Sequence, residues 1–149
     1  MVLGAIPQVR EGMKMLSDIL NKLLVIFKKK DIYTYKSKGE KVKMTRILKS
    51  EHLDVIKIDT TSHDLGVQSE RAWLKRYYSN FEYPMQYVDS IQTEQGKKIF
   101  DVFPISHKTK SKDIYFDITN FYNEPLKFLM DTNEYNKYKI KSLYRKTEK

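Results

Sequence analysis

The fold is predicted chiefly from residues 85–119, which read MQYVDSIQTEQGKKIFDVFPISHKTKSKDIYFDIT. Two polar segments interrupt this stretch, a turn at 94–97 that contains Gly96 and a loop at 107–113. The runs on either side of these segments are rich in β-branched and aromatic residues, which favour extended strands. The pattern predicts a three-stranded antiparallel meander, with strands at 85–93, 98–105 and 114–119.

The middle strand of this meander is predicted to lie inside the sheet. Phe100 and Val102 alternate with Asp101 and Phe103, so both faces of the strand carry large apolar side chains. A strand of this kind is covered on each side, because neither face suits water.

The segment before the meander has the same period of two. Strands are predicted at 32–36, 42–48 and 55–59, with a turn at 37–40 between the first two. In the third strand, Ile56 and Ile58 are expected to face the core.

A helix is predicted at about 67–79, after a loop at 59–66 that is dense in Ser, Thr and Asp. We interpret Ser62 and its neighbours as helix caps, since such side chains accept hydrogen bonds from free backbone N–H groups. The alternative is a small anion site in which His63, beside Asp64, acts as a general base.

The N-terminal segment 7–30 has a helical stripe of apolar residues at spacings of three and four. The stripe predicts an amphipathic helix that lies across the sheet, with Pro7 in its first turn and three lysines in its last. The spacing also fits a short heptad seam, so a homodimer through residues 9–27 is an alternative. The stripe consists of Val9, Met13, Leu16, Leu20, Leu23 and Phe27.

A final helical stretch is predicted from Pro125, followed by a possible frayed basic tail at 133–149. The whole chain is then a single α+β domain over 1–149, with a long N-terminal helix packed on a curved, mainly antiparallel sheet. The element order is α-β-β-(β)-α-β-β-β-α, and it resembles that of cystatin-like and NTF2-like rolls. This resemblance rests on element order alone, and the sequence has no internal repeat.

Composition restricts the class of protein. The chain has 149 residues, of which 40% are hydrophobic, and it contains no cysteine. The hydrophobic content suits an ordinary buried core. The absence of cysteine excludes disulfides, zinc–thiolate sites and thiol catalysis. The longest apolar run is too short to span a bilayer and contains Lys22, so we expect a cytoplasmic protein with no membrane span.

The formal net charge of +9 is unevenly distributed. Residues 1–50 carry 12 basic and 4 acidic side chains, a net +8, whereas residues 51–100 carry 6 and 8, a net −2. A local positive field attracts phosphate-rich or acidic partners. Because 23 of the 28 basic residues are lysines, the alternative is a solvated surface that serves solubility.

Two stretches combine lysines with tyrosines, as single-strand nucleic-acid grooves do. We therefore expect nucleic acid, or failing that an acidic protein, to bind these stretches. The alternative is a lysine-rich edge hairpin and a tail whose tyrosines pack onto the domain. The candidate binding residues are Lys28, Lys29, Lys30, Tyr33, Tyr35, Lys36, Lys38, Lys41, Lys43, Lys137, Lys139, Lys141 and Arg145.

No catalytic set, metal site or cofactor is predicted. The three histidines lack the pairing of a metal site, and phosphate-loop and nucleophile-elbow motifs are missing. The strand carboxylates Asp89, Asp101 and Asp117 could hold a divalent cation if they shared one face. We therefore expect a non-enzymatic binding or assembly module.

The alternative function is a ligand-binding protein or enzyme with a pocket between the first helix and the sheet. That pocket would be lined by Met13, Leu20, Tyr87, Phe100 and Phe116, with His63 or a strand aspartate as its polar group.

Overall fold

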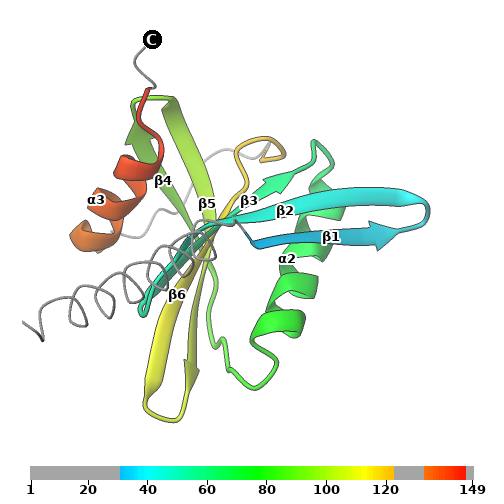
Figure 1. Ribbon diagram of the computed structural model, residues 1–149, viewed down its shortest axis with the longest axis horizontal. Helices are drawn as coiled ribbons and strands as arrows, with labels where there is room; N and C mark the ends of the chain where they lie inside the picture. The colour runs from blue at the N-terminus through cyan, green and yellow to red at the C-terminus, as the bar shows by residue number, and fades with distance from the viewer. Residues whose placement is uncertain (1–30, 123–132, 147–149) are drawn as a thin grey trace, which may run out of the picture. The chain divides into compact units, whose positions relative to one another are not determined.

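The computed structural model describes residues 31–122 and 133–146, which all belong to one compact unit, Asp31–Lys149. Within these ranges the chain forms a six-stranded sheet and two helices (Figure 1). The strands are β1 (Asp31–Ser37), β2 (Glu40–Lys49), β3 (Leu53–Asp59), β4 (Tyr87–Thr93), β5 (Gly96–His107) and β6 (Lys110–Asp117). The helices are α2 (His63–Tyr77) and α3 (Glu134–Leu143).

The sheet consists of two antiparallel meanders joined at its centre. Its strand order is β1-β2-β3-β6-β5-β4, and the only parallel pair is β3 with β6, which are the last strands of the two meanders. Helix α2 is the crossover that lets the second meander return with its last strand parallel to β3. The described elements therefore repeat the order β-β-β-α, although the sequence itself shows no repeat.

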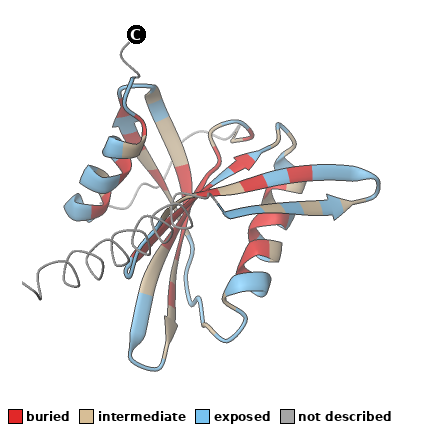
Figure 2. Cartoon of the chain, in the orientation of Figure 1, coloured by how far each residue is buried: buried red, intermediate tan, exposed pale blue. Residues whose placement is uncertain are grey.

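One face of the sheet is covered by α2. Trp73 and Leu74 on the inner side of this helix pack with Ile56 and Ile58 of β3 and Phe103 of β5. All five side chains are buried. Strand β2 contributes alternate residues to this core, which Figure 2 shows as buried positions between exposed ones.

The opposite face is covered in part by α3. Ile140 of α3 and Tyr144 just after it pack against Val55 of β3, Phe100 of β5 and Tyr115 of β6. Val55 and Ile56 are neighbours in sequence yet belong to different cores, as expected for a strand with period two. The strands β3, β5 and β6 are therefore buried on both faces, as predicted for the middle meander strand.

The predicted turns are confirmed. Lys38 and Gly39 adopt positive φ angles of 50° and 81° between β1 and β2, and Gly96 has a φ of 103° between β4 and β5. Glycine adopts such angles without steric strain, which is why Gly39 and Gly96 stand at the hairpin tips. Six predicted strands and the central helix match the structure to within a few residues.

The predicted arrangement of these elements is wrong. We expected a curved, mainly antiparallel roll on a long N-terminal helix, whereas the described unit is a mixed sheet with a parallel central pair. Its faces are covered by α2 and α3, and neither of these helices is N-terminal. The physical reason is that the α2 crossover carries the chain back along the sheet before β4 begins. Strands β4 and β6 therefore run in the same direction as β3.

Several predictions concern residues outside the described ranges. These are the helix at 7–30 with its dimer seam, and the helix from Pro125. The described C-terminal helix lies within the basic tail segment instead, at Glu134–Leu143. Among the described residues, no helix is both long enough and apolar enough to cross a bilayer. The single domain over 1–149 and the cytoplasmic location stay predictions.

Gly66, in the first turns of α2, is expected to reverse the usual effect of a glycine-to-alanine substitution. A Cβ atom here would lie 2.4 Å from ring atoms of Phe121, which is itself buried. At a solvent-exposed position inside a helix, alanine makes the fold more stable than glycine does, by about 0.5–1 kcal/mol. Gly66→Ala should instead lower the free energy of unfolding by about 1–3 kcal/mol, because the ring has to move.

Urea denaturation measures this difference, with Lys75→Ala on the exposed side of α2 as the control. The control should change the free energy of unfolding by less than about 0.5 kcal/mol. A Gly66→Ala protein more stable than the wild type would show that the helix and Phe121 are not in close contact.

Candidate functional site

Five lysines share one face of the sheet, which we name the lysine face: Lys36, Lys41, Lys43, Lys57 and Lys98. Cross-strand partners point to the same side of a sheet, and so do residues two positions apart in a strand. In the strand register, Lys36 lies opposite Lys41, and Lys57 lies opposite Asp117. Asp117 in turn lies opposite Phe100, which is beneath α3. The lysine face is therefore the side of the sheet that α3 covers in part.

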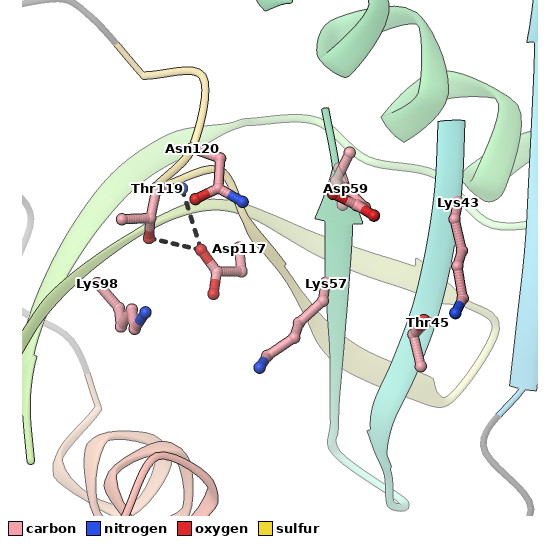
Figure 3. Close-up of a pocket in the computed structure, with 9 residues that line it drawn as sticks. Lys43, Thr45, Lys57, Asp59, Lys98, Asp117, Thr119 and Asn120 are labelled. Carbon is pink, nitrogen blue, oxygen red and sulfur yellow. Dashed lines mark hydrogen bonds between the residues drawn. The ribbon is translucent and has the colours of Figure 1, made fainter. Parts of the chain in front are cut away.

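Three of these lysines surround a pocket of about 270 Å³ (Figure 3). Lys43 comes from β2, Lys57 from β3 and Lys98 from β5, so three strands contribute an ammonium group each. In Figure 3, Lys57 and Lys98 lie on either side of Asp117, and Asn120 lies beside the same carboxylate. The pocket is polar and cationic, with hydrogen-bond donors on several sides.

Tyr144 is held beneath two of the lysines. The ammonium groups of Lys57 and Lys98 lie 5.0 and 5.3 Å from the centroid of its ring, within cation–π range. Its hydroxyl donates a hydrogen bond of 2.6 Å to Oδ2 of Asp117. Burial, together with the Asp117 charge, raises the pKa of Tyr144 far above its usual value, so the hydroxyl stays protonated and remains the donor.

The carboxylate of Asp117 accepts hydrogen bonds from several neighbouring groups of the protein. Besides Tyr144, its Oδ1 accepts from the backbone N–H of Thr119 at 3.0 Å and from the Thr119 hydroxyl. Within the described ranges, no lysine of the lysine face forms an ion pair with a carboxylate. At the pocket, three lysines face two carboxylates, Asp59 and Asp117, so the pocket carries a formal charge of +1.

The first basic and aromatic stretch is divided between the two faces of the β1–β2 hairpin. Lys36, Lys41 and Lys43 belong to the lysine face, and Lys38 lies in the turn. Lys28, Lys29 and Lys30 lie outside the described residues.

The tyrosines of this stretch face α2 instead. The ring of Tyr33 lies 6.4 Å from that of Trp73 and under the guanidinium group of Arg76, while the Tyr35 hydroxyl donates to Gln68 at 3.0 Å. The structure therefore separates these rings from the lysines beside them in sequence.

The second stretch lies on α3 and just after it. Lys137, Lys139 and Lys141 are on the helix, where Lys137 pairs with Glu134 at 3.8 Å and Lys139 lies over Tyr135. The carbonyl of Arg145 accepts a hydrogen bond of 3.1 Å from Gln95 in the β4–β5 turn. Because β4 and β1 are opposite edges of the sheet, the two stretches are not brought together.

Sequence reasoning missed Lys57, Lys98 and the pairing of Tyr144 with Asp117. The available signal was the alternation Val55, Lys57, Asp59 around inward-facing Ile56 and Ile58, which places Lys57 on the outer side of its strand. Which other lysines lie beside it depends on the order and register of the strands.

The loop that enters α2 has the predicted capping role. Ser62 is the N-cap residue, and its hydroxyl accepts a hydrogen bond of 3.3 Å from the backbone N–H of Leu65. The ring of His63 packs edge-on against Phe121 at 6.3 Å. This arrangement accounts for the polar residues of the loop by helix capping.

The strand carboxylates do not converge. Asp89 and Asp117 both lie opposite Phe100, on the face covered by α3, whereas Asp101 lies opposite Phe116, on the other face. Among the described residues, no three acidic or histidine side chains are close enough to hold a metal ion.

Phe100 and Phe116 likewise belong to different cores, so they do not line a common pocket. Tyr87 packs against the same core as Phe100. The other two residues of the proposed ligand pocket, Met13 and Leu20, lie outside the described ranges.

Comparison with protein-family models, curated proteins and solved structures finds no match to this chain.

Tyr144→Phe tests how much the hydrogen bond between Tyr144 and Asp117 contributes to the stability of the fold. The substitution removes the hydroxyl that donates to a buried carboxylate and leaves the ring in place. We expect the free energy of unfolding to fall by about 1.5–3 kcal/mol, the usual contribution of a hydrogen bond to a charged group. Tyr138→Phe on the same helix is the control, since Tyr138 is 68% exposed and should show no change in urea denaturation. Equal stabilities of the two variants would contradict a structural role for the Tyr144–Asp117 bond.

Proposed function

We propose that this protein is a non-catalytic binding module whose lysine face docks on the phosphate backbone of single-stranded nucleic acid. The observation that carries the proposal is the set of five lysines on one sheet face, none of which forms an ion pair with a carboxylate of the described residues. Such ammonium groups are free to replace the counterions of a phosphate chain.

The extent of the lysine face supports a polymeric partner. Its lysines belong to β1, β2, β3 and β5, and β6 lies between the last two. Neighbouring strands are about 4.8 Å apart, so four intervals span about 19 Å. A single small anion in the pocket would meet at most the three lysines that line it, whereas a chain of phosphates would meet all five.

The surface supports backbone contact in preference to base recognition. Lysine is a flexible point charge that attracts phosphate without the fixed geometry of a base contact. The tyrosines that could stack on bases face α2, on the other side of the hairpin. The proposed binding is therefore insensitive to sequence and strongly dependent on salt.

Fluorescence anisotropy with a labelled oligothymidylate of about 20 nucleotides tests the proposal. With five contacts to a single strand, log K should fall with log salt at a slope of about −3.5. Affinity should then drop roughly 100-fold between 50 and 200 mM salt. The variant Lys43→Gln/Lys57→Gln/Lys98→Gln should bind far more weakly, with a slope smaller in magnitude by about 2.

The matched control is Lys75→Gln/Lys97→Gln/Lys110→Gln, which removes the same charge from other surfaces. It should retain most of the affinity and the slope. Undetectable binding at low salt, or an equal loss in both triple variants, would overturn the proposal. Binding of an acidic polypeptide but not of the oligonucleotide would assign the lysine face to a protein partner instead.

A further inference from the structure

A second cavity, of about 470 Å³, lies where β3 and β6 begin, whereas the pocket of the lysine face lies where these strands end. Its walls come from the β2–β3 loop, the β5–β6 turn and the segment after α2. This volume is in the range of small-molecule sites. Neither the proposed nucleic-acid binding nor the sheet core makes use of it.

Lys112 forms the polar floor of this cavity. Its ammonium group donates to Oδ1 of Asp54 at 2.7 Å and to the hydroxyl oxygen of Tyr78 at 3.2 Å. The Tyr78 hydroxyl in turn donates its proton to the other oxygen of Asp54. An ammonium group has three N–H donors, so one is left for a bound molecule.

Two further hydrogen-bond donors lie at the cavity. Lys110 adds a second ammonium group, and Ser111 adds a hydroxyl. Asp54 pairs with Lys112, and it also lies 3.7 Å from Nε of Arg46, which forms a shorter ion pair of 3.1 Å with Asp31. Glu51 is the negatively charged residue that lines the cavity. Its side chain is 87% exposed, and its Oε1 lies 3.8 Å from Nε2 of His52.

One wall of the cavity is aromatic. The ring of Phe81 packs edge-on against Tyr78 with a centroid separation of 5.2 Å, and it lies 5.5 Å from the ring of His107. Phe81 and Tyr78 are partly buried and line the cavity directly. A flat apolar group can pack against these rings, because aromatic surfaces attract one another edge-on or offset.

We propose that this cavity binds a small planar organic acid. Its carboxylate accepts hydrogen bonds from Lys112 and Lys110, and its ring packs against Phe81. The proposal combines an ammonium donor fixed by Asp54 with an apolar wall beside it. It is independent of the proposed nucleic-acid binding, which uses the other end of β3 and β6.

The experiment uses the full chain, labelled with ¹⁵N and titrated at constant ionic strength with sodium benzoate up to about 10 mM. The amide signals of Tyr78, Phe81, Ser111 and Lys112 should shift together, with a Kd of about 1 mM. Acetate lacks the ring and benzyl alcohol lacks the charge, so each should bind at least about fivefold more weakly. No shift at these amides, or equal affinity for all three compounds, would overturn the proposal.

Lys110→Glu provides the matched variant, because Lys110 is exposed and lies outside the Asp54 network. It should weaken benzoate binding about fivefold or more, while Lys75→Glu should leave the Kd unchanged. An unchanged Kd in Lys110→Glu would also overturn the proposal. The triple lysine-face variant should bind benzoate as the wild type does, which separates failure of this inference from failure of the nucleic-acid proposal.

Discussion

Asp54→Ala is expected to lower the free energy of unfolding by about 3–5 kcal/mol. Asp54 is completely buried in β3 and accepts from Lys112 and Tyr78, while Arg46 pairs with it at 3.7 Å. The side chains of Arg46 and Lys112 are only 4% and 13% exposed. Removing the carboxylate would leave two largely desolvated cations, of which only Arg46 keeps a carboxylate partner, Asp31.

Urea denaturation at neutral pH measures this loss. The matched control is Asp59→Ala, which removes an exposed aspartate from the same strand and should change the free energy of unfolding by less than about 0.5 kcal/mol. The double variant Asp54→Ala/Lys112→Met should be less destabilised than the sum of its single variants, because it leaves one buried cation fewer. Similar stabilities for Asp54→Ala and Asp59→Ala would show that the Asp54 network contributes no net stability.

Glu70→Gln is expected to raise the free energy of unfolding by about 3 kcal/mol at pH 7. Glu70 lies on the inner side of α2 and is completely buried. Burial, reinforced by the adjacent Asp101 carboxyl of β5, raises its pKa from 4.5 to about 11. At pH 7 the folded protein therefore holds a proton on Glu70 that the unfolded chain has released.

The direction of the pH dependence follows from this proton. Below pH 4.5 the group is neutral in both states, so the stability of the fold is not reduced. As the pH rises from 4.5 towards 11, the wild type should lose about 1.4 kcal/mol per unit, since only the unfolded chain ionises. A glutamine has no proton to release, so the variant should lack this slope.

Thermal and urea denaturation at pH 4, 7 and 9 would measure the effect, with exposed Glu40→Gln as the control. The two Glu70 proteins should be nearly equal at pH 4 and should diverge as the pH rises. A constant difference at all three pH values would mean that Glu70 is not protonated in the folded state. Asp101→Asn should lower the pKa of Glu70, since it removes the neighbouring charge, so the loss of stability should level off at a lower pH than in the wild type.

The strands and turns could be predicted because their signals are local. Lys38, Gly39 and Gly96 stand at hairpin tips, and the apolar residues of β2 and β3 alternate with the period of a half-buried strand. The cap at Ser62 was equally local, since it depends on residues within one turn of the helix start.

The pairing of the meanders was not predicted, although a signal for it exists. Val55 and Ile56 of β3 and residues 114–116 of β6 are consecutive apolar residues in the sequence, which is typical of parallel strands covered on both faces. The helical stripe at 7–30 predicts instead that a long N-terminal helix covers one face of the sheet. The burial of Glu70 was also missed, because a glutamate on a helix is ordinarily solvated.

The sequence by itself determined where the described chain is extended, where it turns and where α2 begins. These features follow from side-chain periodicity and backbone preference over a few residues. Only the tertiary structure decided that Lys43, Lys57 and Lys98 lie together, that Tyr33 and Tyr35 face the other side, and that Asp54 has Lys112 as its partner. Strand order and register bring these residues together over long sequence separations, and they depend on how two faces of a sheet are buried at once.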